Sequence, residues 1–311
     1  MDSLLSALNG RSVLSLLDVN PEEFSALLTL AAQLKSGAVK PRLDKVLGLL
    51  FQKASTRTRV SFTVAMYQLG GQVIDLNPNV TQVSRGEPLE DTARVLGRYV
   101  DVMAIRTFEQ SNLEKFKAFS GIPVINALTD LYHPCQAIAD VLTMRENFGD
   151  RSDLTLTYLG DGNNVAHSLM LAGALAGINV RVAVPEGYEP DGTVLEKAKE
   201  LAGDRTEVTV THDAAEAVTG AHALYTDVWA SMGQEDLADQ RIPIFQPYQL
   251  NGGLLVKADS EAIVLHCLPA HRGEEITHEA MEGTQSRIWD QAENRLHAQK
   301  ALLVSILGAD F

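Results

Sequence analysis

Short runs of β-branched and other apolar residues alternate with longer amphipathic segments along almost the whole chain of 311 residues. This alternation predicts parallel strands connected by helices that cover both faces of a sheet. Amphipathic segments at 88–99, 133–147, 164–177 and 191–201 are expected to be helices. Strands are expected at residues 46–51, 72–76, 101–105, 123–126, 154–159, 180–184, 207–211, 223–226 and 262–266.

The length of the chain favours two sheets of four or five strands, because a domain usually has about 100–200 residues. The polar stretch F-G-D-R-S-D at 148–153 follows a predicted helix and is the expected seam. We therefore predict an α/β protein whose two domains, 1–147 and 148–289, each hold a parallel sheet flanked by helices on both faces. A further helical segment is expected at 290–311.

Charge and composition narrow the class of protein. With 26 basic and 40 acidic residues the net charge is −14, which disfavours nucleic acid and anionic membranes as partners. No apolar run approaches the roughly 18 residues of a membrane span, and no signal or transit peptide is visible. Two cysteines cannot build a disulfide framework, so we expect a reducing cytoplasm.

Ligands in such folds gather at the carboxyl ends of strands, so the following turns are the candidate sites. The first turn, S-T-R-T-R at 55–59, lies in a segment, 45–64, that holds four cations and no acid. Hydroxyls, helix amides and arginine forks together suit a small anion such as phosphate. Capping of the helix by Ser55 or Thr58 is the alternative, and it can coexist with anion binding.

The next two turns are expected at the same edge of the first sheet. Arg106 ends a predicted strand, and H-P-C-Q at 133–136 places His133 and Gln136 in the first turn of a helix. Convergence of arginine, histidine and glutamine with the S-T-R-T-R turn predicts a pocket for a phosphate and a polarised carbonyl.

The turn Y-L-G-D-G-N-N at 158–164 resembles a degraded dinucleotide motif. Gly160 and Gly162 are present, but Val165 replaces the third glycine, and no acidic residue ends the following strand to bind a ribose. Asn163 and Asn164 are alternatively interpreted as amides that face a carboxylate.

Two further turns carry reactive side chains. D-V-W-A-S-M-G at 227–233 places Asp227 at a strand end, and H-C-L-P at 266–269 places Cys267 beside the Leu268–Pro269 bond. His266, Cys267 and His271 do not have a standard zinc spacing, so no metal site is predicted.

From Lys53 to Arg295 these motifs resemble, in order, the ornithine branch of the aspartate/ornithine carbamoyltransferase family. S-T-R-T-R, the Arg106 turn and H-P-C-Q resemble the carbamoyl-phosphate site that the family shares. D-V-W-A-S-M-G and H-C-L-P resemble the ornithine version, since the aspartate branch has a different loop and a proline in place of the cysteine.

The resemblance implies carbamoyl transfer from carbamoyl phosphate to the side-chain amine of L-ornithine, giving L-citrulline and phosphate in arginine biosynthesis. Domain 1–147 would bind carbamoyl phosphate, domain 148–289 would bind ornithine, and the active site would lie in the cleft between them. The closing helix would pack back on the first domain. A homotrimer with shared active sites, a cis Leu268–Pro269 bond and the absence of metal or organic cofactors are also implied.

The resemblance assigns roles to individual residues. Catalytic roles fall to Arg106, His133, Asp227 and Cys267. Ornithine would be bound by Asn164, Asp227, Ser231 and Met232. Carbamoyl phosphate would be bound by Ser55, Thr56, Arg57, Thr58, Gln82 of a neighbouring subunit, Arg106, His133, Gln136, Cys267, Leu268 and Arg295.

Three alternatives stay open. A carbamoyltransferase for putrescine or an acylated ornithine would not need Asp227, Ser231 and Asn164 together, because each of those substrates lacks a charged α group. A nucleotide-binding regulatory protein would use the turn at 160–164. A non-catalytic member of the family would retain the motifs without activity.

Overall fold

The computed structural model describes residues 4, 6–77, 86–230 and 238–309. The chain folds into two compact units. Unit 1 comprises Met1–Leu142 and Asn294–Phe311, and unit 2 comprises Thr143–Glu293.

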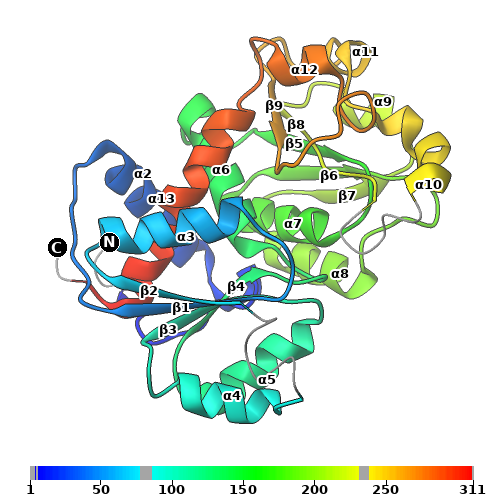
Figure 1. Ribbon diagram of the computed structural model, residues 1–311. Coiled ribbons are helices and arrows are strands. Elements are labelled where there is room, and N and C mark those ends of the chain that lie inside the picture. The colour runs from blue at the N-terminus through cyan, green and yellow to red at the C-terminus, as the bar shows by residue number, and fades with distance from the viewer. Residues whose placement is uncertain (1–3, 5, 78–85, 231–237, 310–311) are drawn as a thin grey trace. The chain divides into compact units, whose positions relative to one another are not determined.

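Unit 1 is built on a four-stranded parallel sheet in the order β2-β1-β3-β4. In Figure 1, α4 and α5 lie on one face of this sheet and α3 lies on the other. Buried apolar side chains such as Met103, Leu113 and Phe116 join the sheet to α4 and α5. The strands are β1 (Val46–Phe51), β2 (Gln72–Leu76), β3 (Val102–Arg106) and β4 (Val124–Leu128). The helices are η1 (Leu16–Asp18), α2 (Pro21–Ser36), α3 (Arg57–Gln68), α4 (Leu89–Leu96), α5 (Gln110–Ser120) and parts of α6 (Pro134–Phe148) and α13 (Ile288–Leu307).

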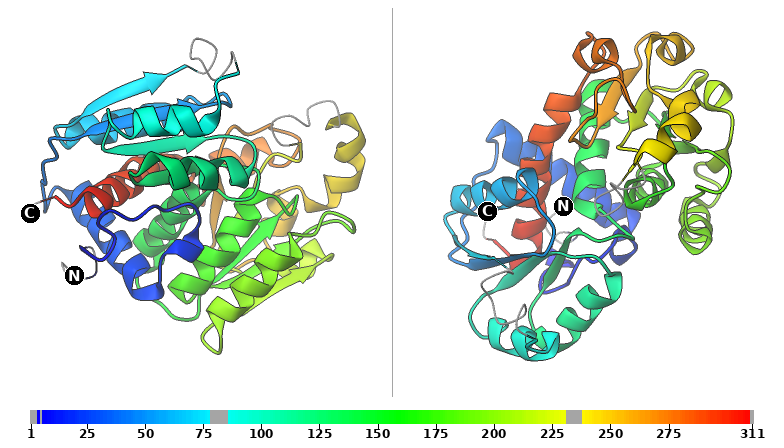
Figure 2. Two further views of the ribbon diagram at one scale, coloured as in Figure 1. Left: turned by 90° about the horizontal axis from the view of Figure 1, so that it is seen from below. Right: turned by 45° about the vertical axis from the view of Figure 1, so that its right-hand side comes forward.

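Unit 2 is built on a five-stranded parallel sheet in the order β7-β6-β5-β8-β9. In Figures 1 and 2, α7 and α8 cover one face, and α9, α11 and α12 cover the other. The strands are β5 (Thr155–Leu159), β6 (Asn179–Ala183), β7 (Val208–Thr211), β8 (Ala223–Thr226) and β9 (Ile263–His266). The helices are α7 (Asn164–Ala176), α8 (Gly192–Ala202), α9 (Ala214–Val218), α10 (Ala238–Phe245), η5 (Gln246–Tyr248), α11 (Gly252–Leu255) and α12 (His278–Glu282).

The strand register aligns the carboxyl ends within each sheet. In unit 1, Arg106 pairs with Phe51 on one side and with Leu128 on the other. In unit 2, Thr226 pairs with Leu159 and with His266. The turns that follow these strands therefore begin at one edge of each sheet.

The predicted fold class is confirmed. Each expected strand is present, and the observed strand ends differ from the predicted ones by at most two residues. The two compact units divide inside helices α6 and α13, at Leu142–Thr143 and at Glu293–Asn294.

The side-chain contacts of α6 explain this division. Gln136 near its amino end bonds with Arg295 of unit 1, whereas Asn147 near its carboxyl end accepts a hydrogen bond from Arg287 of unit 2. Among the described residues, no helix is both long enough and apolar enough to cross a membrane.

Candidate active site

The turn between β1 and α3 carries the predicted anion-binding residues of unit 1. Helix α3 begins at Arg57, and its N-cap Thr56 makes no side-chain capping hydrogen bond. Ser55 is half-buried, Thr56 and Arg57 are exposed, and Thr58 is buried. The amides of this first turn carry the positive end of the helix dipole, so the turn suits an anion.

The cationic segment 45–64 is largely neutralised by ion pairs. Lys45 pairs with Asp101, Lys53 with Asp130 and Arg59 with Asp75. Arg57, in contrast, forms no ion pair with any described residue. Three of the four cations of this segment are thus paired with acidic residues in the described part of the chain, and Arg57 at the helix start is the fourth.

His133 lies at the centre of a positively charged cluster. Burial lowers the pKa of His133 well below its ordinary value, and the charges of Arg295, Arg106 and Arg57 lower that pKa further. The imidazole is therefore neutral near pH 7 and can donate only one N–H. The three arginines come from the end of β3, the start of α3 and the helix α13.

Arg295 connects two of the other predicted residues. Its Nη1 donates a hydrogen bond to Gln136 Oε1 at 2.9 Å, and its Nη2 donates to Thr58 Oγ1. Gln136 Nε2 in turn donates to Asp140 Oδ1 at 2.8 Å. All four side chains are buried, so they form a continuous polar network within unit 1.

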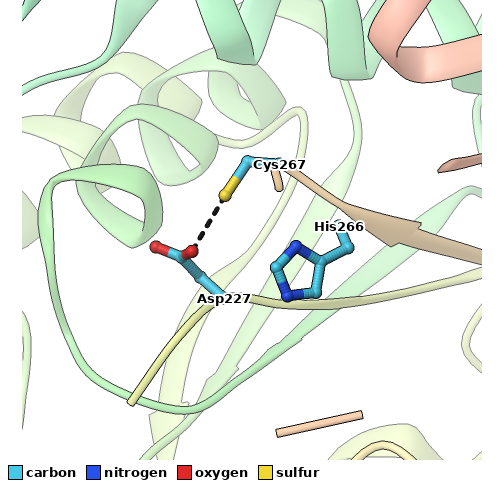
Figure 3. Close-up of side chains that lie close together, drawn as sticks. All are labelled: Asp227, His266 and Cys267. Carbon is cyan, nitrogen blue, oxygen red and sulfur yellow. Dashed lines mark hydrogen bonds between the residues drawn. The ribbon is translucent and has the colours of Figure 1, made fainter. Parts of the chain in front are cut away.

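In unit 2, Asp227 and Cys267 follow β8 and β9 and face each other. The Cys267 thiol donates to Asp227 Oδ1 at 2.9 Å, as Figure 3 shows. The Val228 amide donates to the same oxygen at 2.8 Å, and Asn163 Nδ2 donates to Oδ2 at 2.9 Å. The carboxylate is thus oriented through both of its oxygens.

Asn163 has two functions that the motif did not reveal. Its Oδ1 caps α7 by accepting from the amides of Val165 and Ala166. The Tyr158 hydroxyl donates to the same Oδ1 at 3.3 Å. Burial raises the pKa of Tyr158 well above its ordinary value, and Asp227 raises it further, so the hydroxyl keeps its proton. The amide nitrogen of Asn163 is left to face the Asp227 carboxylate, and Asn164 begins α7 half-buried.

The glycine turn is shaped by the protein's own chain. A Cβ on Gly162 would lie 2.3 Å from the backbone nitrogen of Pro190, and the Gly162 amide donates to Tyr188 O. Gly162 is therefore required by the close approach of this neighbouring loop. This packing explains the glycine without a dinucleotide.

The H-C-L-P turn is held by a histidine and a glutamate. The Leu268–Pro269 bond is cis, as the family resemblance implied. The Leu268 amide donates to His266 Nδ1 at 2.8 Å, which places the imidazole proton on Nε2, where it bonds to Glu275 Oε1 at 3.0 Å. His266 thereby connects the turn to a buried carboxylate.

Two groups in the described part of the chain have ligand atoms close enough together for a metal. They are Asp227 with His266 and Cys267, and His271 with Glu274 and Glu275. In the first group, both ring nitrogens of His266 are hydrogen bonded, and the Cys267 thiol bonds to Asp227. These internal hydrogen bonds explain the first group without a metal.

Three predicted site residues, Gln82, Ser231 and Met232, lie outside the described residues. Three side chains that the motifs did not identify as site residues, Tyr158, Asp140 and Glu275, bond directly to residues of the site or its turns. Asp140 could have been found from its position four residues after Gln136 on a helix, where two side chains are neighbours.

Both units match known family models. The model described as the carbamoyl-P binding domain of aspartate/ornithine carbamoyltransferase matches residues 11–146, and the model of the Asp/Orn binding domain matches residues 152–306. The chain belongs to the aspartate/ornithine carbamoyltransferase family.

Relatives within that family are similar over nearly the whole chain. The ornithine carbamoyltransferase of Nostoc punctiforme is 67% identical over 306 residues, which cover 98% of this chain and 100% of the relative. The crystal structure of ornithine carbamoyltransferase from Gloeobacter violaceus is 59% identical with a TM-score of 0.89, covering 96% of this chain and 99% of that one. The ornithine carbamoyltransferase from Pyrococcus furiosus is 48% identical with a TM-score of 0.93, covering 97% and 98% of the two chains.

Proposed function

We propose that this protein transfers the carbamoyl group of carbamoyl phosphate to the side-chain amine of L-ornithine, giving L-citrulline and phosphate. The observation that carries the proposal is the contrast between the two units. Unit 1 gathers Arg57, Arg106 and Arg295 around His133, whereas unit 2 presents the Asp227–Cys267 pair. A cationic site suits an acyl phosphate, and an acidic site suits an amine.

Unit 1 would bind the phosphate and polarise the carbonyl. The phosphate gains charge as it leaves, and Arg57, Arg106 and the backbone amides of 55–58 would neutralise that charge. The carbonyl oxygen also gains negative charge during attack, and it would accept hydrogen bonds from Thr58, Arg106 and the neutral His133. Gln136 would accept a hydrogen bond from the carbamoyl NH₂.

Unit 2 would prepare the nucleophile. A lysine-like amine has a pKa of about 10.4, so only ~0.1% is neutral near pH 7.4, a penalty of about 4 kcal/mol. Asp227 and Cys267 would accept and relay the proton that the amine loses. Leu268 and Cys267 would also contact the carbamoyl group.

The α groups of ornithine would be held by the same unit. Asp227 and Ser231 would bind the α-amino group, and Asn164 with the Met232 amide would bind the α-carboxylate. Putrescine lacks the carboxylate, and an acylated ornithine lacks the charged amine. The complete set of residues therefore favours free ornithine.

The proposal includes a homotrimer in which Gln82 reaches a neighbouring active site. Helix α3 and the edge strand β2 leave Val60, Tyr67 and Ile74 exposed, at 54%, 57% and 43%. Apolar side chains of this kind at a sheet edge suit a second copy of the chain. Light scattering would test the trimer, and mixing Gln82→Ala with Arg57→Ala subunits would restore activity if sites are shared.

We also propose that the protein works in the cytoplasm, in arginine biosynthesis. Both cysteines, Cys135 and Cys267, are free thiols, which suits a reducing compartment. Growth that depends on added citrulline or arginine after deletion of the gene would support the biosynthetic direction.

The deciding experiment measures carbamoylated product from purified protein and carbamoyl phosphate with four amines supplied separately: ornithine, putrescine, acetylornithine and aspartate. We expect turnover with ornithine to exceed the others by a large factor. A preference for another amine would reassign the substrate, and no turnover with any of them would contradict an enzymatic function.

A further inference from the structure

We propose that Asp140 is a positioning residue that sets the orientation of the Gln136 amide, and that this orientation selects an acyl phosphate ending in NH₂. The inference rests on the proposed function, because it concerns the substrate group that Gln136 would contact. Asp140 touches no reacting atom in this scheme and acts only through Gln136.

Gln136 lies between two groups of opposite hydrogen-bonding character. Gln136 and Asp140 are one turn apart on α6 and are 1% and 0% exposed. Gln136 Nε2 donates to Asp140 Oδ1 at 2.8 Å, and Gln136 Oε1 accepts from Arg295 Nη1 at 2.9 Å.

The chemistry of these two neighbours dictates the same orientation of the amide. An ionised carboxylate only accepts hydrogen bonds, and a guanidinium only donates them. Rotation of the amide by half a turn would place its oxygen against Asp140 and its NH₂ against Arg295. Both contacts would then be repulsive in a buried site, where a polar mismatch is most costly.

The orientation decides which substrate group can bind. A carbonyl oxygen has two lone pairs, and Arg295 uses one, so Gln136 Oε1 can accept one further N–H. A carbamoyl group offers an N–H, whereas an acetyl group of similar size offers a methyl. Gln136 held in this way therefore favours carbamoyl phosphate over acetyl phosphate.

The test compares the affinities for carbamoyl phosphate and acetyl phosphate in Asp140→Asn. Asparagine keeps the shape of Asp140 but can accept or donate, so one of the two contacts that fix the Gln136 amide no longer selects an orientation, and only Arg295 still does. We expect the preference for carbamoyl phosphate to fall by about tenfold, the effect of one hydrogen bond. Affinity for acetyl phosphate should stay within about twofold, because both ligands share the phosphate and the carbonyl.

Glu23→Gln is the matched control. Glu23 is another buried carboxylate of unit 1, and it bonds to Arg11 and to the Asn20 amide at the start of α2. This substitution should leave the preference for carbamoyl phosphate unchanged. An equal loss of preference in Glu23→Gln would assign the effect to general destabilisation and overturn the proposal.

A double-mutant cycle separates positioning from a structural role. In a Gln136→Ala background, Asp140→Asn should not change the preference further, since the side chain through which Asp140 acts is absent. An additive loss would overturn the proposal. If Asp140→Asn does not fold, Asp140→Glu keeps an acceptor-only group and should retain the preference, and its loss there would count equally against the proposal.

The failures of the two proposals are distinguishable. A parent protein that does not prefer carbamoyl phosphate over acetyl phosphate contradicts the proposed function. A parent that has this preference, together with an Asp140→Asn variant that keeps it, contradicts only the role of Asp140.

Discussion

Helices α3 and α7 occupy corresponding places in the two units, since each follows a central strand at the carboxyl edge of a parallel sheet. Their amino ends differ. Asn163 caps α7 through its side chain, whereas Thr56 at the start of α3 makes no side-chain capping bond. The same architecture can therefore serve opposite charges, because an uncapped helix start suits an anion and a capping amide can hold a carboxylate.

An amide side chain also has a corresponding role in each unit. Gln136 turns its oxygen to a guanidinium, whereas Asn163 turns its nitrogen to the Asp227 carboxylate. In each unit, the other polar atom of the amide bonds to a group that can only accept or only donate a hydrogen bond. The amide therefore has one favourable orientation. The polarity of each site is thus fixed by neighbours that need not touch the substrate.

Asp227→Asn should have the largest effect of these substitutions. Removal of a general base lowers the reaction rate by about 10²- to 10⁴-fold, so we expect turnover to decrease by a factor in that range. Affinity for carbamoyl phosphate should stay constant, because its phosphate would be bound by unit 1. Steady-state kinetics and calorimetry check the two expectations, and near-normal turnover would remove Asp227 from proton transfer.

Arg57→Ala should weaken carbamoyl-phosphate binding by about 100-fold, or about 3 kcal/mol, because it leaves phosphate charge unpaired. Arg59→Ala is the control, because Arg59 pairs with Asp75. A half-exposed ion pair contributes less than about 1 kcal/mol to the stability of the fold, so this variant should fold and bind normally. Calorimetry with both variants would separate the two arginines. Equal losses would mean that overall charge, not the helix start, governs binding.

Cys267→Ala should reduce turnover by about tenfold, the effect of one hydrogen bond to the Asp227 carboxylate, with a smaller change in carbamoyl-phosphate affinity. Burial raises the pKa of the other cysteine, Cys135, to about 12, so that thiol stays protonated and Cys135→Ala serves as the control. The measurement is turnover at saturating ornithine. An unchanged value for Cys267→Ala would exclude the thiol from the mechanism.

Asn163→Ala tests the link between a helix cap and the Asp227 carboxylate. We expect a loss of about 1 kcal/mol in the free energy of unfolding together with a several-fold loss of turnover. Asp191→Ala removes the corresponding side-chain cap of α8 in the same unit and should reduce stability alone. If both variants reduce turnover equally, the cap rather than the orientation of Asp227 is responsible.

The last prediction concerns the effect of acid on His133. Its folded pKa lies below the ordinary value of 6.5, so below about pH 6.5 the unfolded chain binds a proton that the folded chain does not. As the pH decreases below about 6.5, protonation of this histidine in the unfolded chain should therefore lower the free energy of unfolding by up to about 1.4 kcal/mol per pH unit. This loss should stop once the pH reaches the folded pKa of His133. Urea unfolding between about pH 5 and about pH 7 should show a shallower dependence for His133→Gln.

Local sequence determined a large part of this protein. Strand and helix positions follow from periodicity within a few residues, and β1, β2 and β8 begin and end where the pattern predicts. Placement of the turns at one edge follows from parallel pairing, because all the carboxyl ends then point the same way. The family, too, could be identified from short motifs in order.

Tertiary structure alone decided the contacts between residues far apart in the chain. Arg295 meets Gln136 from 159 residues away, and Asn163 meets Asp227 from 64 residues away. The low pKa of His133 depends on burial and on arginines from three segments, so it cannot be inferred from any single motif. Hydrogen bonds and charge interactions act over a few ångströms of space, whereas periodicity reports only on neighbours along the chain.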